Sequence, residues 1–286
     1  MKRFICSVAI AIVFAVAPIC QAQERPALYM VSVGISKYKD QRFEKGVAFA
    51  AKDAQDVANH FASQRGKMFS SVEVRLLNDQ QATKAGVEKA LDWLQANAKP
   101  NAYTLFFFAG HGGPNALGNY ECSVHDTNLL LASTRLQGSW LKDRLHKIQG
   151  KRIVVLDTCH SGGFGFKGAE FAAFAACTAK QISYEHPSIQ NGFFTRCFLD
   201  GLRGGADLNR DGQVTLAEIE QYVNHKLPGM TENRQQLTHY RPSGFSADTP
   251  LSHVGSNPIV PASHSVPSAP TSNPSPQQGF KTGPRM

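Results

Sequence analysis

The chain has 286 residues, of which 42% are hydrophobic and 18% are charged, and its formal net charge is +8. This length allows one substantial α/β domain with an appendage, and the composition is that of an ordinary globular protein. Lys and Arg form no dense run, so the basic balance gives no reason to expect nucleic-acid binding.

The N-terminal 22 residues have the layout of a secretory signal peptide. Lys2 and Arg3 form a positive start, residues 4–19 are almost wholly apolar, and Ala22 is a small residue at the expected cleavage site. We therefore expect an exported protein, periplasmic or extracellular, with no membrane span after cleavage. A retained membrane anchor is the alternative, because the apolar stretch is of borderline length for crossing a bilayer.

Segments of strand type alternate with segments of helical spacing between residues 28 and 202. The run YTLFFFA is apolar at every position, which indicates a strand covered on both faces, and Thr83 is a plausible helix N-cap. Such alternation implies crossover connections and a mostly parallel sheet with helices on both faces, an α/β fold. The sequence predicts strands at 28–35, 72–77, 103–109, 152–156 and 171–176, and helices at 47–61, 83–97, 136–148 and 193–202.

The character of the chain changes after Leu202. Gly204 and Gly205 interrupt the helical pattern, and a short helix is predicted from Thr215 to about Lys226. The last stretch is rich in Pro and Ser and has almost nothing to bury, so we expect it to be disordered. The predicted units are a signal peptide (1–22), a main domain (23–203), a C-terminal extension (204–254) and a tail (255–286).

Two predicted strands run directly into reactive side chains flanked by glycine. The strand at 103–109 is followed by His111, and the strand at 152–156 by Cys159, 48 residues further on. Ligands bind at the carboxyl ends of parallel strands, so the two side chains meet if the strands are neighbours. A thiolate with an imidazole beside it is the pair needed to attack a carbonyl. The backbone N–H groups of Gly112 and Cys159 are candidate donors for the resulting oxyanion.

The motifs FFFAGHGG and IVVLDTCHSGG resemble the paired histidine and cysteine motifs of caspase-like cysteine peptidases, and are closest to metacaspases and bacterial orthocaspases. The resemblance spans roughly residues 28–207. It implies a caspase-hemoglobinase-type three-layer sandwich and endopeptidase activity on protein or peptide substrates. By the same resemblance, Cys159 is the nucleophile and His111 the general base, with the DTC motif in place of the QAC motif of caspases proper.

Two acidic residues match the carboxylates that line the substrate pocket of metacaspases. Asp157 lies two residues before the nucleophile, and Asp53 lies in the AAKDAQDV helix. The resemblance therefore places both in the S1 pocket. Two buried carboxylates facing one cleft favour a cation, so we expect cleavage after Arg or Lys.

A second motif after the main domain matches an EF-hand calcium loop. Oxygen-bearing residues occupy positions one, three, five and twelve, with glycine at six, and such loops wrap a hard cation in oxygen ligands. The alternative is an Asp-rich turn that caps the following helix. No second hand is visible, so we expect weak calcium binding, and no organic cofactor. The predicted ligands are Asp207, Asn209, Asp211, Gln213 through its carbonyl, Thr215 and Glu218.

Several alternatives stay open at this point. The chain could be a catalytically silent caspase-fold scaffold, or a transpeptidase that uses the same acyl-enzyme. Self-cleavage is plausible after a basic residue such as Lys167 in the glycine-rich stretch beyond the nucleophile. The oligomeric state and the pairing of the cysteines that follow the signal peptide are not determined by the sequence.

Overall fold

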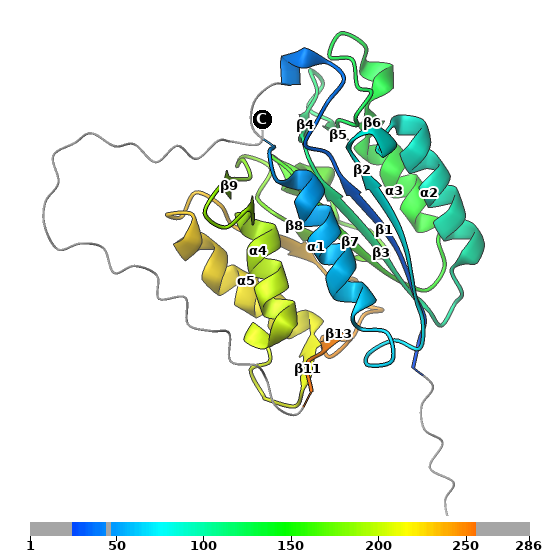
Figure 1. Ribbon diagram of the computed structural model, residues 1–286, viewed down its shortest axis with the longest axis vertical. Coiled ribbons are helices and arrows are strands. Elements are labelled where there is room, and N and C mark those ends of the chain that lie inside the picture. The colour runs from blue at the N-terminus through cyan, green and yellow to red at the C-terminus, as the bar shows by residue number, and fades with distance from the viewer. Residues whose placement is uncertain (1–24, 44–46, 256–286) are drawn as a thin grey trace, which may run out of the picture.

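The computed structural model describes residues 25–43 and 47–255, and a six-stranded sheet forms its centre (Figure 1). The strand order is β12-β8-β7-β3-β1-β2, with every pair parallel except the edge pair β12–β8. The predicted signal peptide and nearly all of the predicted tail lie outside the described residues. The strands are β1 (Leu28–Gly34), β2 (Val72–Asn78), β3 (Tyr103–Ala109), β7 (Lys151–Asp157), β8 (Ala172–Ala175) and β12 (Thr238–Tyr240).

The side chains of β3 show how the sheet builds two cores. Leu105 and Phe107 pack with one set of helices, whereas Phe106 and Phe108 pack with the other, because successive strand residues point to opposite faces. Helices α1, α4 and α5 cover the first face, and α2 and α3 cover the second (Figure 1). The predicted three-layer α/β sandwich is confirmed. The helices are α1 (Ala50–Ala62), α2 (Lys84–Asn97), α3 (Gly138–His146), α4 (Phe193–Asp200) and α5 (Leu216–Met230).

Helix α2 begins where the sequence predicts. The Thr83 side chain accepts a hydrogen bond of 3.0 Å from the Gly86 N–H, which satisfies one of the donors that a helix start leaves without an internal partner. The helix predicted at 136–148 differs from the structure at its start. Leu136 pairs instead with Cys122 of a small antiparallel sheet, and α3 follows at Gly138. The small sheet consists of β4 (Gly112–Pro114), β5 (Tyr120–Cys122) and β6 (Leu136–Gln137).

Residues after 203 share the core of the main domain. Strand β12 extends the main sheet, and Leu216, Val223 and Leu227 of α5 lie in the same hydrophobic cluster as α1 and α4. A short π-helical turn, Gly201–Gly205, links α4 to this part, and Gly204 adopts a φ of 117° there. The remaining short strands are β9 (Glu185–His186), β10 (Asn191–Gly192), β11 (Gln213–Thr215) and β13 (Pro250–His253).

The described residues contain neither a membrane-spanning helix nor a disulfide. Within residues 25–43 and 47–255, no helix is both long enough and apolar enough to cross a membrane. All four cysteines of this part of the chain, Cys122, Cys159, Cys177 and Cys197, are buried, and no disulfide joins any two of them.

Gly34 gives a direct test of how α1 is seated on the sheet. A Cβ atom at position 34 would lie 2.6 Å from the Ala54 Cβ and would also collide with the Ala50 carbonyl, so the helix would have to move. We expect Gly34→Ala to lower the free energy of unfolding by about 1–3 kcal/mol in urea denaturation. Gly229→Ala is the matched control, because nothing lies within 4 Å of its Cβ position in α5. That variant should be neutral or slightly stabilising, and equal effects from the two substitutions would contradict the packing described.

Candidate active site

The pairing of β3 with β7 places His111 and Cys159 at one edge of the sheet. Ala109 pairs with Asp157, so each of the two residues lies two positions beyond the same pair. The Gly110 N–H donates to the Asp157 carbonyl at 3.3 Å, which keeps the two segments together past the end of the ladder. The two strands are therefore neighbours in the sheet, as predicted.

Aromatic rings pack beside His111. The Tyr38 ring centroid lies 4.9 Å from that of His111, and the Phe43 ring stacks on it at 5.1 Å. The backbone N–H of His111 donates to the Tyr38 hydroxyl at 2.8 Å. Gly110 allows this close approach, because a Cβ there would lie 2.7 Å from the Tyr38 oxygen and its φ is 156°. These contacts fix the position of the imidazole.

Cys159 sits at a sharp turn beyond β7. His160 adopts the left-handed conformation, with a φ of 56°, and the chain then enters a short 3₁₀ turn, Ser161–Phe164. The Cys159 side chain is buried, and its Sγ accepts a hydrogen bond of 3.4 Å from the Ser183 N–H. A donor aimed at sulfur stabilises negative charge on it.

The structure brings Asp53 and Asp157 to the same segment of the chain. Both are fully buried. Asp157 accepts from the Thr195 hydroxyl at 2.5 Å and from the Ser183 hydroxyl at 2.7 Å. Asp53 accepts from the Gly192 N–H at 3.1 Å. Gly192 is the residue that precedes α4 and Thr195 lies in its first turn, and the N-terminal N–H groups of a helix favour negative charge.

The residues that hold these carboxylates do not follow any pattern in the sequence. Ser183 contacts both Cys159 and Asp157, yet it lies in an irregular loop with no pattern to mark it. A third buried acid, Glu185 in β9, accepts from the backbone N–H groups of Ala48 at 2.6 Å and Phe49 at 3.2 Å. It therefore holds the two residues that immediately precede α1, the helix that carries Asp53. Asn191 and Gly192, which precede α4, are the residues of this group that the sequence could have indicated, because asparagine and glycine favour turns and helix caps.

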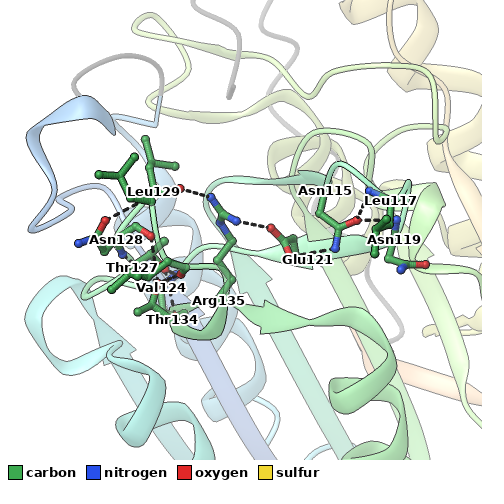
Figure 2. Close-up of polar contacts among 12 residues, drawn as sticks. Asn115, Leu117, Asn119, Glu121, Val124, Thr127, Asn128, Leu129, Thr134 and Arg135 are labelled. Carbon is green, nitrogen blue, oxygen red and sulfur yellow. Dashed lines mark hydrogen bonds and ion pairs between the residues drawn. The ribbon is translucent and has the colours of Figure 1, made fainter.

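A pocket of about 420 Å³ lies beside His111 and is lined by residues of β4 and β5 and of the loops next to them. Glu121 and Arg135 line it and form an ion pair with a distance of 2.7 Å (Figure 2). Both side chains are largely buried, with exposed fractions of 7% and 17%. No sequence pattern marks this pair, since Glu121 lies on a strand of three residues and Arg135 immediately precedes a strand of two.

The predicted calcium loop folds back on its own backbone. The Asp207 carboxylate accepts from the N–H groups of Asp211 and Gly212, both at 3.1 Å. Glu218 accepts from the Thr215 N–H at 2.9 Å, which completes a capping box at the start of α5. In the described part of the chain, no three His, Cys, Asp or Glu side chains converge as a ready metal site. Oxygen-bearing side chains of the loop nevertheless border a common pocket of about 350 Å³, together with Asp248, which the motif did not include.

Comparisons with known proteins agree with this architecture. Metacaspase-1A of Aspergillus oryzae is 34% identical over 102 residues, which are 31% of this chain and 24% of that protein. Metacaspase-1 of Saccharomyces cerevisiae is 31% identical over 124 residues, 38% of this chain and 28% of that protein. The matched segments thus span about a quarter of the length of these curated relatives.

The fold and a family model extend the likeness over most of the chain. A crystal structure of a protein from Geobacter sulfurreducens aligns with a TM-score of 0.59 at 16% identity and covers 80% of this chain and 100% of that one, which shows a shared fold. The model of the caspase domain matches residues 30–246. Since this match includes both strands that carry His111 and Cys159 and most of the chain around them, the protein belongs to the caspase domain family.

Proposed function

We propose that this protein is a cysteine endopeptidase in which Cys159 attacks the substrate carbonyl and His111 acts as general base. The observation that carries the proposal is the β3–β7 register, which places both residues two positions beyond one strand pair. The relatives' name, metacaspase, supports the same chemistry. The geometry around each residue, a donor on the sulfur and a packed imidazole, agrees with this division of roles.

The reaction follows from these groups. His111 takes the proton of the Cys159 thiol, and the thiolate adds to the carbonyl carbon to give a tetrahedral oxyanion. The C–N bond then breaks as His111 donates the proton to the leaving amine. A water molecule, deprotonated by His111, attacks the thioester, and the acid product leaves as the thiol is restored.

The proposed oxyanion donors are the N–H groups of Gly112 and Cys159. The Ser123 N–H donates to the His111 carbonyl at 3.0 Å, so residue 111 occupies a hydrogen-bonded position of the β4–β5 ladder. The next residue, Gly112, then directs its N–H away from β5 by the alternation of an antiparallel pair. One donor of this kind contributes about 3 kcal/mol in other proteases.

We propose that Asp53 and Asp157 recognise Arg or Lys before the scissile bond. Both carboxylates lie on the face of the sheet that carries α1 and α4, and both accept hydrogen bonds at the N-terminal end of α4. Glu185 adds a third buried carboxylate at the start of α1. A substrate side chain bound beside these three carboxylates would be favoured if cationic and disfavoured if acidic.

Removal of the nucleophile tests the enzymatic proposal. We expect Cys159→Ala to lose peptide hydrolysis by at least about 1,000-fold, because no other group can form the acyl-enzyme. Cys197→Ala is the control, since burial raises the pKa of the Cys197 thiol to about 12 and keeps it protonated. The measurement is a digest of a peptide library followed by mass spectrometry. Undiminished cleavage by Cys159→Ala would refute the assignment.

A neutral isostere of arginine tests the pocket. We expect wild-type protein to cleave fluorogenic peptides with arginine before the bond far better than the same peptides with citrulline. Asp157→Asn and Asp53→Asn should each shrink this ratio of kcat/KM about 30-fold, because removing one partner of a buried charge pair costs about 2–5 kcal/mol. Asp143→Asn, at an exposed site in α3, should leave the ratio unchanged. Equal cleavage of the arginine and citrulline peptides, or better cleavage after aspartate, would disprove the pocket.

We also propose that the 207–218 loop binds calcium weakly. What supports this is the chemistry of the pocket lining, which consists of hard oxygen donors such as Asp211, Glu218 and Asp248. Because Asp207 and Glu218 already accept from backbone N–H groups, the ion must draw the carboxylates together as it binds. Affinity in the millimolar range follows, whether calcium supports the fold or influences activity.

Calorimetry and thermal unfolding test the calcium proposal together. We expect a measurable heat of binding and a rise of a few degrees in Tm at millimolar calcium, because a ligand that binds the folded state stabilises it. Asp211→Asn should abolish both signals, whereas Asp143→Asn should preserve them. The absence of heat and of any rise in Tm with the wild-type protein would end the proposal.

Two further proposals rest on the sequence. Export depends on residues 1–22, which lie outside the described part of the chain. Self-processing after Lys167 is supported by its exposed position between Gly165 and Gly168, both at positive φ. A single unchanged band after long incubation with calcium would remove the second proposal.

A further inference from the structure

The pocket beside His111 is lined by the small sheet, which packs with a different core from the helices that hold the two aspartates. Asp53 and Asp157 are anchored to α4, on the face of the sheet that α1 and α4 cover. The small sheet packs with the other core, since Tyr120, Cys122 and Leu136 belong to the cluster that includes α2 and α3. A bound peptide that passes from one side to the other must therefore cross the edge of the sheet between Cys159 and His111.

The path of the residues that follow the scissile bond is set by the residues that bind the other half of the peptide. Its arginine or lysine is held on the α4 side, the carbonyl lies at Cys159, and the amine receives its proton from His111. The residues after the scissile bond then continue past His111 and reach the pocket that His111, Gly112, Glu121 and Arg135 share. This step rests on the function proposed above.

Arg135 is the cationic group of that pocket, and its position is fixed from two sides. One terminal nitrogen meets Glu121 at 2.7 Å, and the other donates to the Leu129 carbonyl at 2.9 Å (Figure 2). Glu121 also accepts from the Asn115 side chain at 3.3 Å. The more exposed member of the ion pair is Arg135. Since these two contacts use two of the five N–H donors of a guanidinium, the group can present others to a ligand.

The loop that carries Leu129 is tied to the residues that pack on His111. Asp40 accepts from the Leu129 N–H at 3.0 Å, and Arg42 donates to the Asn128 side chain at 3.1 Å. The Arg42 guanidinium beside Asp40 holds the pKa of that carboxyl well below its usual range, so the carboxylate stays charged and bonded. Phe43, which stacks on His111, follows directly. The guanidinium of Arg135 and the imidazole are thus held by one connected set of contacts.

We propose that this pocket, through Arg135, selects substrates with an acidic residue at the first or second position after the scissile bond. The cleft is then polarised, with carboxylates on the side of the acyl group and a guanidinium on the side of the leaving group. A peptide with a basic residue followed closely by an acidic one complements both halves. Glu121 positions Arg135 and moderates its charge.

Isosteric peptide pairs test the proposal. Internally quenched peptides share an arginine before the bond and differ only by Asp or Asn at the first or second position after it. With the wild-type protein we expect kcat/KM to favour Asp about 10-fold at one of these positions, which corresponds to one charge-assisted hydrogen bond. Arg135→Gln should bring the Asp/Asn ratio to about 1. Glu121→Gln should raise it, because the guanidinium loses the carboxylate that offsets its charge.

Arg152→Gln is the matched control. Arg152 has the same exposed fraction as Arg135, 17%, and pairs with Glu170 at 3.2 Å near the opposite end of β7; this variant should keep the wild-type ratio. A wild-type ratio near 1, or a ratio that survives Arg135→Gln, overturns the proposal. If Arg135→Gln does not fold, a ratio that fails to rise in Glu121→Gln overturns it equally. Failure of the wild-type protein to cleave any arginine peptide would instead refute the proposed arginine specificity, and failure to cleave any peptide of the library would refute the peptidase function itself.

Discussion

The parallel pairing of β3 with β7 is the contact on which the rest of the site depends. The pairing ends with Ala109 opposite Asp157. Beyond that point the two segments diverge into glycine-rich loops that carry His111 and Cys159. A slip of one residue in this pairing would turn every side chain of one strand to the other face. The burial of all seven residues of β3 between two helical layers makes such a slip costly, so the core itself fixes the spacing of the two reactive groups.

Charge is distributed unevenly around this fixed point. Asp53, Asp157 and Glu185 are buried on the side of α1 and α4, and each accepts hydrogen bonds from backbone N–H groups or hydroxyls that offset the loss of water. On the side of the small sheet, Arg135 is paired with Glu121 yet remains the more exposed partner. The same principle accounts for both arrangements, since a buried charge persists only where fixed dipoles or an opposite charge satisfy it.

The sequence predicted the parts of the structure that repeat a pattern. The buried strands could be predicted because they are apolar runs. His111 and Cys159 could be predicted as reactive residues because each follows such a run and is flanked by glycines. The features that the sequence could not predict depend on contacts between segments far apart in the chain. Ser183 reaches Asp157 across 26 residues, and Asn191 reaches Asp53 across 138. Strand β5, which carries Glu121, and strand β6, which follows Arg135, are too short to show any periodicity, so the sequence did not reveal the Glu121–Arg135 pair. The division at residue 203 was drawn from a change in composition, whereas the hydrophobic contacts of α5 continue across it.

Covalent labelling of the nucleophile tests most directly whether Cys159 and His111 act as a pair. The protein is incubated with a short peptide that ends in arginine bearing an electrophilic ketone, and the modified residue is located by mass spectrometry. The expected result is a single adduct on the Cys159 sulfur that disappears in His111→Ala, because the imidazole must remove the thiol proton. The other thiols should stay unmodified, as burial raises the pKa of Cys122 and Cys197 to about 12. An adduct on another cysteine, or labelling of Cys159 at an undiminished rate without His111, would contradict the pairing of these two residues.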